Sequence, residues 1–304
     1  MRNFTKDNGG NTLDVFMRSS RPSPPASSPE PPAPPPFDAY APAQIALWVR
    51  EVGVTKSTMP VLTMFALAVL AGAFIALGAL FFTITMTTGT TGQPRAFGLM
   101  RLAGGITFSL GLILAVVGGA ELFTGNNLIA MAWASGRVTT QQVMKNWGWV
   151  YLGNLVGAVG TAVLVWLAGV HRMSDGAVGE MMVQIARSKI AHDPVSALAR
   201  GVLCNVLVCL AVWLCMGARS VTDKILATVF PITAFVACGF EHSVANIYFL
   251  PIGVALAAGT SAPLSVTGAV SNLALVTLGN VLGGTVLVAL VYWSVYLRNL
   301  DQPA

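Results

Sequence analysis

The sequence predicts an all-helical integral membrane protein with six transmembrane helices that form two inverted halves. Apolar residues make up 55% of the 304 residues, and charged residues make up only 10%. Long stretches carry no charge at all, as between Lys56 and Arg95 or between His242 and Arg298. A helix needs about 20 apolar residues to cross a bilayer. The composition therefore excludes a soluble globular fold, and a motif that occurs twice in the same order predicts the two halves.

Residues 1–43 differ in composition from everything that follows. Nine prolines fall within residues 22–36, with serine and alanine between them. Such a segment cannot bury a core, so we expect a disordered, proline-rich tail. Residues 44–58 come next, and their apolar side chains recur at helical spacing around Trp48. This pattern predicts a short amphipathic helix at the membrane surface.

The membrane domain, residues 59–298, contains six apolar spans and is followed by a short tail, 299–304. The spans cover about 59–86, 99–134, 147–170, 195–217, 224–258 and 270–297. Two of them are too long for one straight crossing and carry charge in the middle: the second contains Glu121, and the fifth contains Glu241 and His242. We therefore expect the second and fifth helices to be broken within the membrane.

The two long spans share a motif that is repeated, with its surroundings, along the chain. Both contain a glutamate, four further residues and an asparagine, ending at Asn126 and Asn246. The spans that follow them both contain Leu-Gly-Asn, at Asn154 and Asn280. Each half has three spans, so the second half enters the membrane from the opposite side. An inverted repeat of this kind places a substrate path near the midplane, between the halves.

The charged residues at the ends of the spans do not orient the protein. With the N-terminus inside, seven basic residues flank the spans on the inner side and six on the outer side. The positive-inside rule needs a clearer excess than this. The residues alone leave the orientation open.

Ionisable side chains at membrane depth must face protein or water. For Glu121 and Glu241 we favour a structural role, in which the carboxylates accept backbone N–H groups freed by the helix breaks. His242 is the one histidine inside a span, and we favour a functional role because imidazole exchanges protons near neutral pH. The Thr124 hydroxyl and the Asn205 amide complete a donor set suited to a small oxyanion.

Other chemistries find little support in the sequence. The four cysteines lie in apolar segments, so we expect buried thiols without a metal cluster or a disulfide framework. There is no phosphate loop and no catalytic triad, and no basic run predicts nucleic-acid binding. We therefore expect a protein that is not an enzyme and that carries no metal or cofactor.

The two broken-helix motifs resemble the signatures of the formate/nitrite transporter family. The residues are Gly-Ala-Glu-Leu-Phe-Thr-Gly-Asn, ending at Asn126, and Gly-Phe-Glu-His-Ser-Val-Ala-Asn, ending at Asn246. The segment Ala71–Gly78 and the Leu-Gly-Asn motifs are also similar to that family. The resemblance extends from about Phe37 to Leu300, so only the proline-rich tail lies outside it.

The resemblance implies a homopentamer of aquaporin-like protomers, each with one pore, in the bacterial cytoplasmic membrane with both termini cytoplasmic. It implies that His242, Thr124 and Asn205 lie at the pore centre and Lys189 in the periplasmic vestibule. Further residues match the cytoplasmic constriction (Leu112, Leu122, Phe123 and Val208) and the periplasmic one (Phe108 and Phe235).

From these expectations follows transport of a small monovalent acid anion, drawn in by Lys189. Formate is the first candidate, and nitrite, hydrosulfide, acetate and lactate are the alternatives. A charged anion cannot pass apolar rings easily, so we expect it to take a proton near His242, directly or through water, and to cross as the neutral acid. Passage as an anion past a cationic His242 stays open, and so does the direction of flux.

Overall fold

The computed structural model describes residues 39–87 and 96–300, and every regular element within these ranges is a helix. These residues belong to one compact unit that begins at Ala39. The predicted proline-rich tail, residues 1–43, falls almost wholly outside the described part of the chain. An all-helical fold, as the composition predicts, is confirmed.

The first half contains a helix before the first span, three long helices and a break. Its elements are α2 (Pro42–Thr58), α3 (Val61–Met86), α4 (Phe97–Val117), the short η1 (Gly125–Ile129), α5 (Ala130–Ala134) and α6 (Thr140–Leu167). The second predicted span is therefore interrupted between α4 and η1. A helix was also expected at 44–58, and α2 begins two residues earlier because Pro42 suits the first turn of a helix.

The second half repeats this order. Its elements are η2 (Val170–Arg172), α7 (Ala177–Ile190), α8 (Pro194–Gly217), α9 (Val221–Ala237), α10 (Ser243–Ala257), α11 (Val266–Val281), the wider-wound η3 (Leu282–Leu290) and α12 (Val291–Tyr296). The six predicted spans leave the segment before α8 without a helix, which is wrong. It forms α7, whose buried residues Val178, Met182 and Ala186 recur every four positions.

Five of the described helices are long and apolar enough to cross a membrane: α3, α4, α6, α8 and the continuous run from α11 to α12. The fifth predicted span is absent from this set because it is divided into α9 and α10. Each of those two helices is shorter than the thickness of a bilayer requires.

Glycines allow the long helices to approach closely. A Cβ atom at Gly157 of α6 would lie 1.9 Å from the Val69 carbonyl oxygen of α3. The second half repeats the contact, since a Cβ at Gly283 would lie 2.2 Å from the Val202 carbonyl oxygen of α8. Small residues of this kind are typical of helix contacts in membranes, where van der Waals packing drives association.

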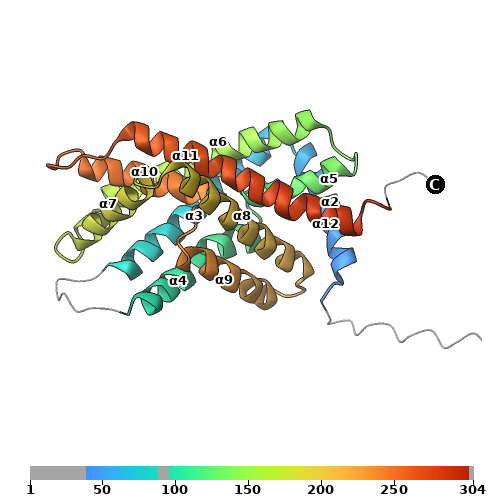
Figure 1. Cartoon of the computed structure of the whole chain (residues 1–304), viewed down its shortest axis with the longest axis horizontal. Helices are drawn as coiled ribbons and strands as arrows, with labels where there is room; N and C mark the ends of the chain where they lie inside the picture. Colours follow the sequence, from blue (N-terminus) through green and yellow to red (C-terminus); the bar gives the residue numbers. More distant parts are fainter. Residues whose placement is uncertain (1–38, 88–95, 301–304) are drawn as a thin grey trace, which may run out of the picture. The chain divides into compact units, whose positions relative to one another are not determined.

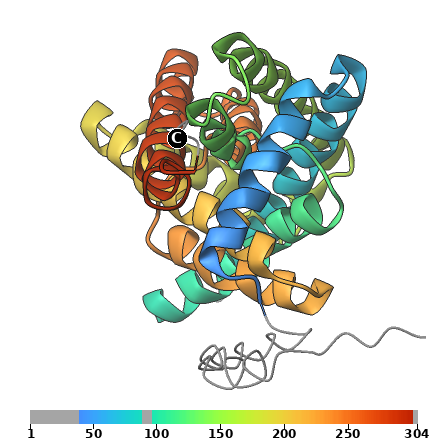
Figure 2. The same ribbon diagram turned by 90° about the vertical axis from the view of Figure 1, so that its right-hand side faces the viewer.

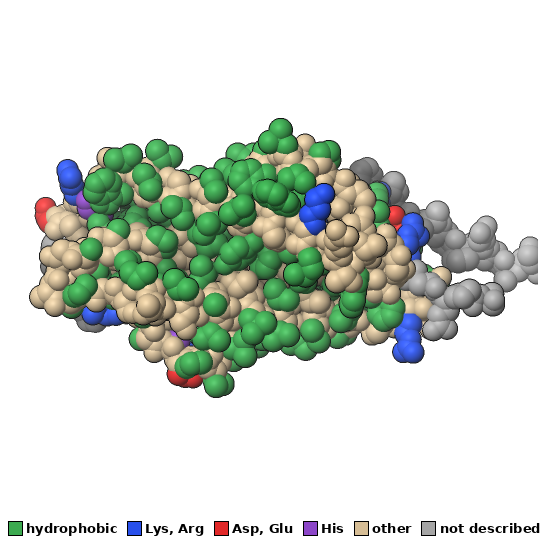
Figure 3. All heavy atoms as spheres, turned by 90° about the horizontal axis from the view of Figure 1, so that it is seen from above, with side chains coloured by type: hydrophobic (Ala, Val, Ile, Leu, Met, Phe, Trp, Pro, Cys, Tyr) green, Lys and Arg blue, Asp and Glu red, His purple; other side chains and the backbone are tan. Residues whose placement is uncertain are grey.

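Figure 1 shows α2 and α12 at one end of the described unit and α7 at the other. Figure 2 shows α2 crossing the first of these ends. Hydrophobic side chains cover much of the face in Figure 3, and charged side chains lie mostly toward its two ends. This distribution is the one expected of a chain that lies in lipid.

Candidate functional site

The two helix breaks have the same backbone conformation. Gly119 and Gly239, which follow the ends of α4 and α9, have φ of +74° and +72°. Glycine adopts this left-handed conformation without steric cost, so it can end a helix sharply. The chain then runs irregularly until η1 in the first half and α10 in the second.

Two asparagines bind the backbone that the breaks expose. Asn154 Oδ1 accepts the Phe123 N–H at 2.9 Å, and Asn280 Oδ1 accepts the Ser243 N–H at 2.9 Å. Their amide groups donate to the carbonyl oxygens of Glu121 and Glu241, each at 3.0 Å. The asparagines of the two Leu-Gly-Asn motifs therefore hold the two breaks in matching positions.

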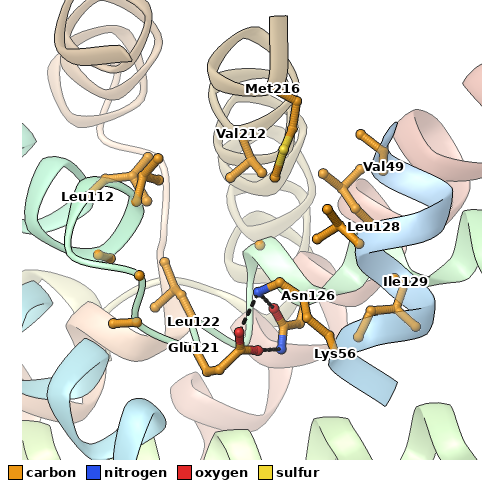
Figure 4. A pocket seen from close by; sticks show the side chains of 17 residues that line it. Val49, Lys56, Leu112, Glu121, Leu122, Asn126, Leu128, Ile129, Val212 and Met216 are labelled. Carbon is orange, nitrogen blue, oxygen red and sulfur yellow. Dashed lines mark hydrogen bonds and ion pairs between the residues drawn. The ribbon is translucent and has the colours of Figure 1, made fainter. Parts of the chain in front are cut away.

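The first glutamate pairs with a lysine that the sequence analysis did not select. Lys56 Nζ lies 2.7 Å from Glu121 Oε1 and 2.9 Å from Asn126 Oδ1. Asn126 also donates to Glu121 Oε2 at 2.7 Å. Figure 4 shows this group against the apolar side chains of one cavity. Glu121 is buried, and a buried carboxylate of this kind requires a charged partner.

The second glutamate has equivalent partners in its own half. Lys189 Nζ lies 3.0 and 3.1 Å from the two oxygens of Glu241, and Asn246 donates to Oε2 at 2.7 Å. The expectation that these carboxylates accept backbone N–H groups was wrong. Asparagine side chains bind the exposed backbone instead, because an amide can both accept and donate where a carboxylate can only accept.

His242 and Thr124 bring the two breaks together. Thr124 Oγ1 lies 2.9 Å from His242 Nε2, and both side chains are buried. The Ala245 N–H donates to Nδ1 of the same ring at 3.1 Å. Because Nδ1 accepts, the neutral ring carries its proton on Nε2 and donates to Thr124. The threonine keeps its own O–H for another acceptor.

Asn205 lies beside this pair, yet its amide nitrogen is engaged within the protein. It contacts the carbonyl oxygens of Asn280 at 2.6 Å and Thr124 at 3.3 Å, and Asn127 Oδ1 at 2.8 Å. The amide carries two N–H groups for these three acceptors. Contact between Asn205 and a substrate stays a prediction.

Two cavities open toward opposite ends of the unit. The Lys56 cavity, about 240 Å³, is lined by Lys56, Glu121 and Asn126 together with apolar residues that include Leu112, Leu122, Leu128, Val212 and Met216. The Lys189 cavity, about 250 Å³, is lined by Arg101, Lys189, His192, Arg200, Glu241, His242 and aromatic residues that include Phe82, Phe108, Phe235 and Phe249.

Buried apolar side chains separate the cavities. The rings of Phe108 and Phe235 meet edge to face at 5.6 Å, and Phe235 stacks on His242 at 5.9 Å. Leu112 and Leu122 line the Lys56 cavity from the other direction. Of the remaining expected constriction residues, Val208 is buried, and Phe123 packs edge-on against Tyr151 at 4.9 Å.

One repeat signal could have revealed Lys56. Lys56 precedes Lys189 by 133 residues, and Leu67 precedes Arg200 by the same interval. The Leu67 carbonyl oxygen accepts the N–H of Glu121, and the Arg200 carbonyl oxygen accepts the N–H of Glu241. The sequence analysis began its repeat at the glutamates and did not extend it to the preceding helices. Arg101 and Arg200 were counted only for orientation.

The cysteines follow the expectation in three cases out of four. Cys204, Cys209 and Cys215 are buried, whereas Cys238 is exposed, so the prediction for Cys238 was wrong. Cys238 directly follows the last residue of α9. Within the described ranges, no group of three or more His, Cys, Asp or Glu side chains could hold a metal ion.

The family model for formate/nitrite transporters matches residues 43–294. The chain belongs to that family. It is 45% identical to the formate channel FocA of Escherichia coli K12 over 282 residues, which are 88% of this chain and 98% of the relative. A probable formate transporter of Methanothermobacter thermautotrophicus is 36% identical over 85% of this chain and 98% of the relative.

Solved structures agree with this assignment. A pentameric formate channel with formate bound superposes with a TM-score of 0.70 at 38% identity, covering 78% of this chain and 98% of that one. An ion channel of the same family gives a TM-score of 0.74 at 28% identity, covering 83% and 98%. The resemblance drawn from the two broken-helix motifs is confirmed, and the protein is a multi-pass membrane protein of a transporter family.

Proposed function

We propose that this chain forms a pH-dependent channel for small monovalent acid anions, with formate as the first substrate and nitrite as the second. The observation that carries the proposal is the contact of His242 Nε2 with Thr124 Oγ1, where the two broken helices meet between two cavities. Hydrosulfide, acetate and lactate are further candidates. The relatives that are named as formate channels support formate over the others.

The physical basis is the free energy of moving charge through an apolar barrier. Between the cavities the path is bounded by Phe108, Phe235, Leu112 and Leu122, which offer no hydrogen bonds to replace water. Transfer of a bare carboxylate into such surroundings costs far more than transfer of the neutral acid. A proton taken up before the barrier and released after it lowers that cost.

His242 and Thr124 supply the polar contact at the barrier. The neutral ring donates through Nε2, and the threonine hydroxyl is free to donate to an oxygen of the substrate. The N-terminus of α10 begins at the same place and adds positive potential. A small anion at the His242–Thr124 contact is therefore stabilised by hydrogen bonding and by positive potential where it takes up its proton.

The hydrogen bonds of His242 favour delivery of this proton through water. A cationic ring would need a proton on Nδ1, which accepts the Ala245 N–H. It would also place a positive charge at the start of α10, where the helix dipole opposes it. A proton from the bulk solution, relayed by the water of a vestibule, can pass to the anion while the ring keeps its tautomer, and the acid returns it to water on the other side. The same contacts speak against passage as an anion past a cationic His242, the second mechanism.

The proposal includes a homopentamer with one pore in each protomer, in the bacterial cytoplasmic membrane with both termini in the cytoplasm. The pentameric neighbour supports the assembly. Six crossings in an aquaporin-like arrangement, with a surface helix at 44–58, are part of the same proposal. The described helices and both helix breaks support them.

The test is uptake by proteoliposomes that contain the purified full chain, with formate, nitrite and hydrosulfide compared across proton gradients of both signs. We expect flux that grows when the proton gradient favours uptake of the acid. No flux of any of the three, in vesicles shown to contain folded pentamer, would overturn the proposed function.

A further inference from the structure

The two vestibules of this proposed channel differ in charge. In the Lys56 cavity the single lysine is paired with Glu121, so the lining has no excess charge. In the Lys189 cavity the lysine is paired with Glu241, but Arg101 and Arg200 also line the wall. Among the described residues that line these cavities, only the Lys189 side therefore has an excess of basic side chains.

The two arginines converge on one place, the break after α9. Arg101 Nε donates to the Ala237 carbonyl oxygen at 3.0 Å, and Arg200 Nη1 donates to the Gly239 carbonyl oxygen at 2.7 Å. A Cβ atom at Gly239 would lie 3.1 Å from Arg101 Nη2 and 3.2 Å from Arg200 Nη1. The two guanidinium groups are thus close enough to donate to one small oxyanion.

Each guanidinium group has donors to spare. Arg101 and Arg200 each make two hydrogen bonds to described residues. A guanidinium carries five N–H groups, in a planar arrangement that matches the two oxygens of a carboxylate. Neither arginine forms an ion pair with a described carboxylate, so the positive charge is available to a ligand.

Stabilisation of the helix end does not by itself explain the arginines. The break after α4 has the same backbone, with Gly119 at φ +74° against +72° for Gly239. In the repeat, Leu67 of α3 stands at the position that matches Arg200, and Val221 of α9 stands at the position that matches Arg101. One break thus forms without either arginine.

We infer that Arg101 and Arg200 form an anion-capture site for a small monovalent carboxylate or similar oxyanion, present in the Lys189 vestibule alone. The inference rests on the proposed function and deepens it. Two unneutralised guanidinium groups at the wall of a partly enclosed cavity concentrate anions there and speed their entry. The Lys56 cavity is not lined by a corresponding pair of arginines. Capture of anions from the two sides of the membrane is therefore unequal.

The test uses proteoliposomes that contain the full chain. The orientation of the inserted protein is measured by the fraction of an N-terminal tag that an external protease removes. Formate uptake at low ionic strength is measured separately from each side. The variants are Arg101→Val and Arg200→Leu, which introduce the residues of the other half, and Arg200→Lys, which keeps the charge. Arg187→Gln removes an exposed charge from α7, outside this cavity, and serves as the control.

We expect each of the first two variants to raise the half-saturating formate concentration from the Lys189 side at least about threefold, with entry from the other side unchanged. Salt should reduce this difference, since it screens exposed charge. Arg200→Lys keeps the charge but loses the planar donor arrangement, so its half-saturating concentration should lie between those of the parent protein and Arg200→Leu. Arg187→Gln should behave as the parent protein. Unchanged half-saturation in folded Arg101→Val and Arg200→Leu would overturn the capture site, as would an equal effect on both sides.

A purely structural role gives a different result. Arg200→Lys would then match Arg200→Leu in flux and in melting temperature, because the bond to Gly239 is altered in both. Absence of flux in the parent protein would overturn the proposed function itself, so the two failures are distinguishable.

Discussion

Thr124 Oγ1 and His242 Nε2 lie 2.9 Å apart, and each residue comes from the break of a different half. The Ala245 N–H fixes the acceptor side of the same ring. One hydrogen bond therefore joins the two halves at the centre of the proposed path.

Replacement of His242 by phenylalanine should abolish the proton-coupled flux or reduce it about tenfold or more. Phenylalanine keeps a ring against Phe235 but cannot donate to Thr124 Oγ1, so the hydroxyl that donates to the substrate is no longer held in place. The measurement is formate uptake in proteoliposomes as a function of pH. His171→Phe is the matched control, because His171 stacks on Trp166 outside both cavities. This variant should transport normally. Full pH-dependent flux in His242→Phe would contradict the role assigned to the ring.

Thr124→Val should lower flux several-fold, and Thr124→Ser should retain most of it. Valine has the shape of threonine without the hydroxyl, so the buried Nε2–H loses its acceptor at a cost of about 1–3 kcal/mol. Flux and melting temperature of both variants are compared. Equal transport by the valine and serine variants would show that the hydroxyl is dispensable.

Lys56→Met should destabilise the protein by roughly 3–5 kcal/mol, because it leaves the buried Glu121 carboxylate without its charged partner. The double variant Lys56→Met/Glu121→Gln should recover much of this loss, since no uncompensated charge remains. Thermal unfolding of the detergent-solubilised protein measures both. If the double variant were no more stable than the single one, the ion pair would not be the reason for the loss.

Gly157→Ala should disrupt the contact between α3 and α6. The added methyl group would lie 1.9 Å from the Val69 carbonyl oxygen, which belongs to a helix backbone and cannot move aside. We expect a loss of stability of about 1–3 kcal/mol or more and a lower yield of folded protein. Gly160→Ala in the same helix has no atom within 4 Å and should leave the melting temperature unchanged or raise it.

The fold was predictable where the sequence signal is local to a segment. Apolar runs indicate spans, and Glu121 and Glu241 within them indicate breaks, because charge is costly at membrane depth. The amphipathic α7 was missed since charged and polar residues hide its four-residue spacing of apolar side chains. Assembly, orientation and the roles of the residues at the site stay predictions.

By itself, the sequence determined the membrane class, the repeated halves, the family and the candidate residues, since each depends on composition or on motif spacing. Only the tertiary structure decided the partners: Lys56 for Glu121, Asn154 and Asn280 for the exposed backbone, and Thr124 for His242. These pairs join residues far apart in the chain. A hydrogen bond or ion pair depends on distances of about 3 Å, and no spacing along the chain specifies such distances until helix packing has brought the two halves together.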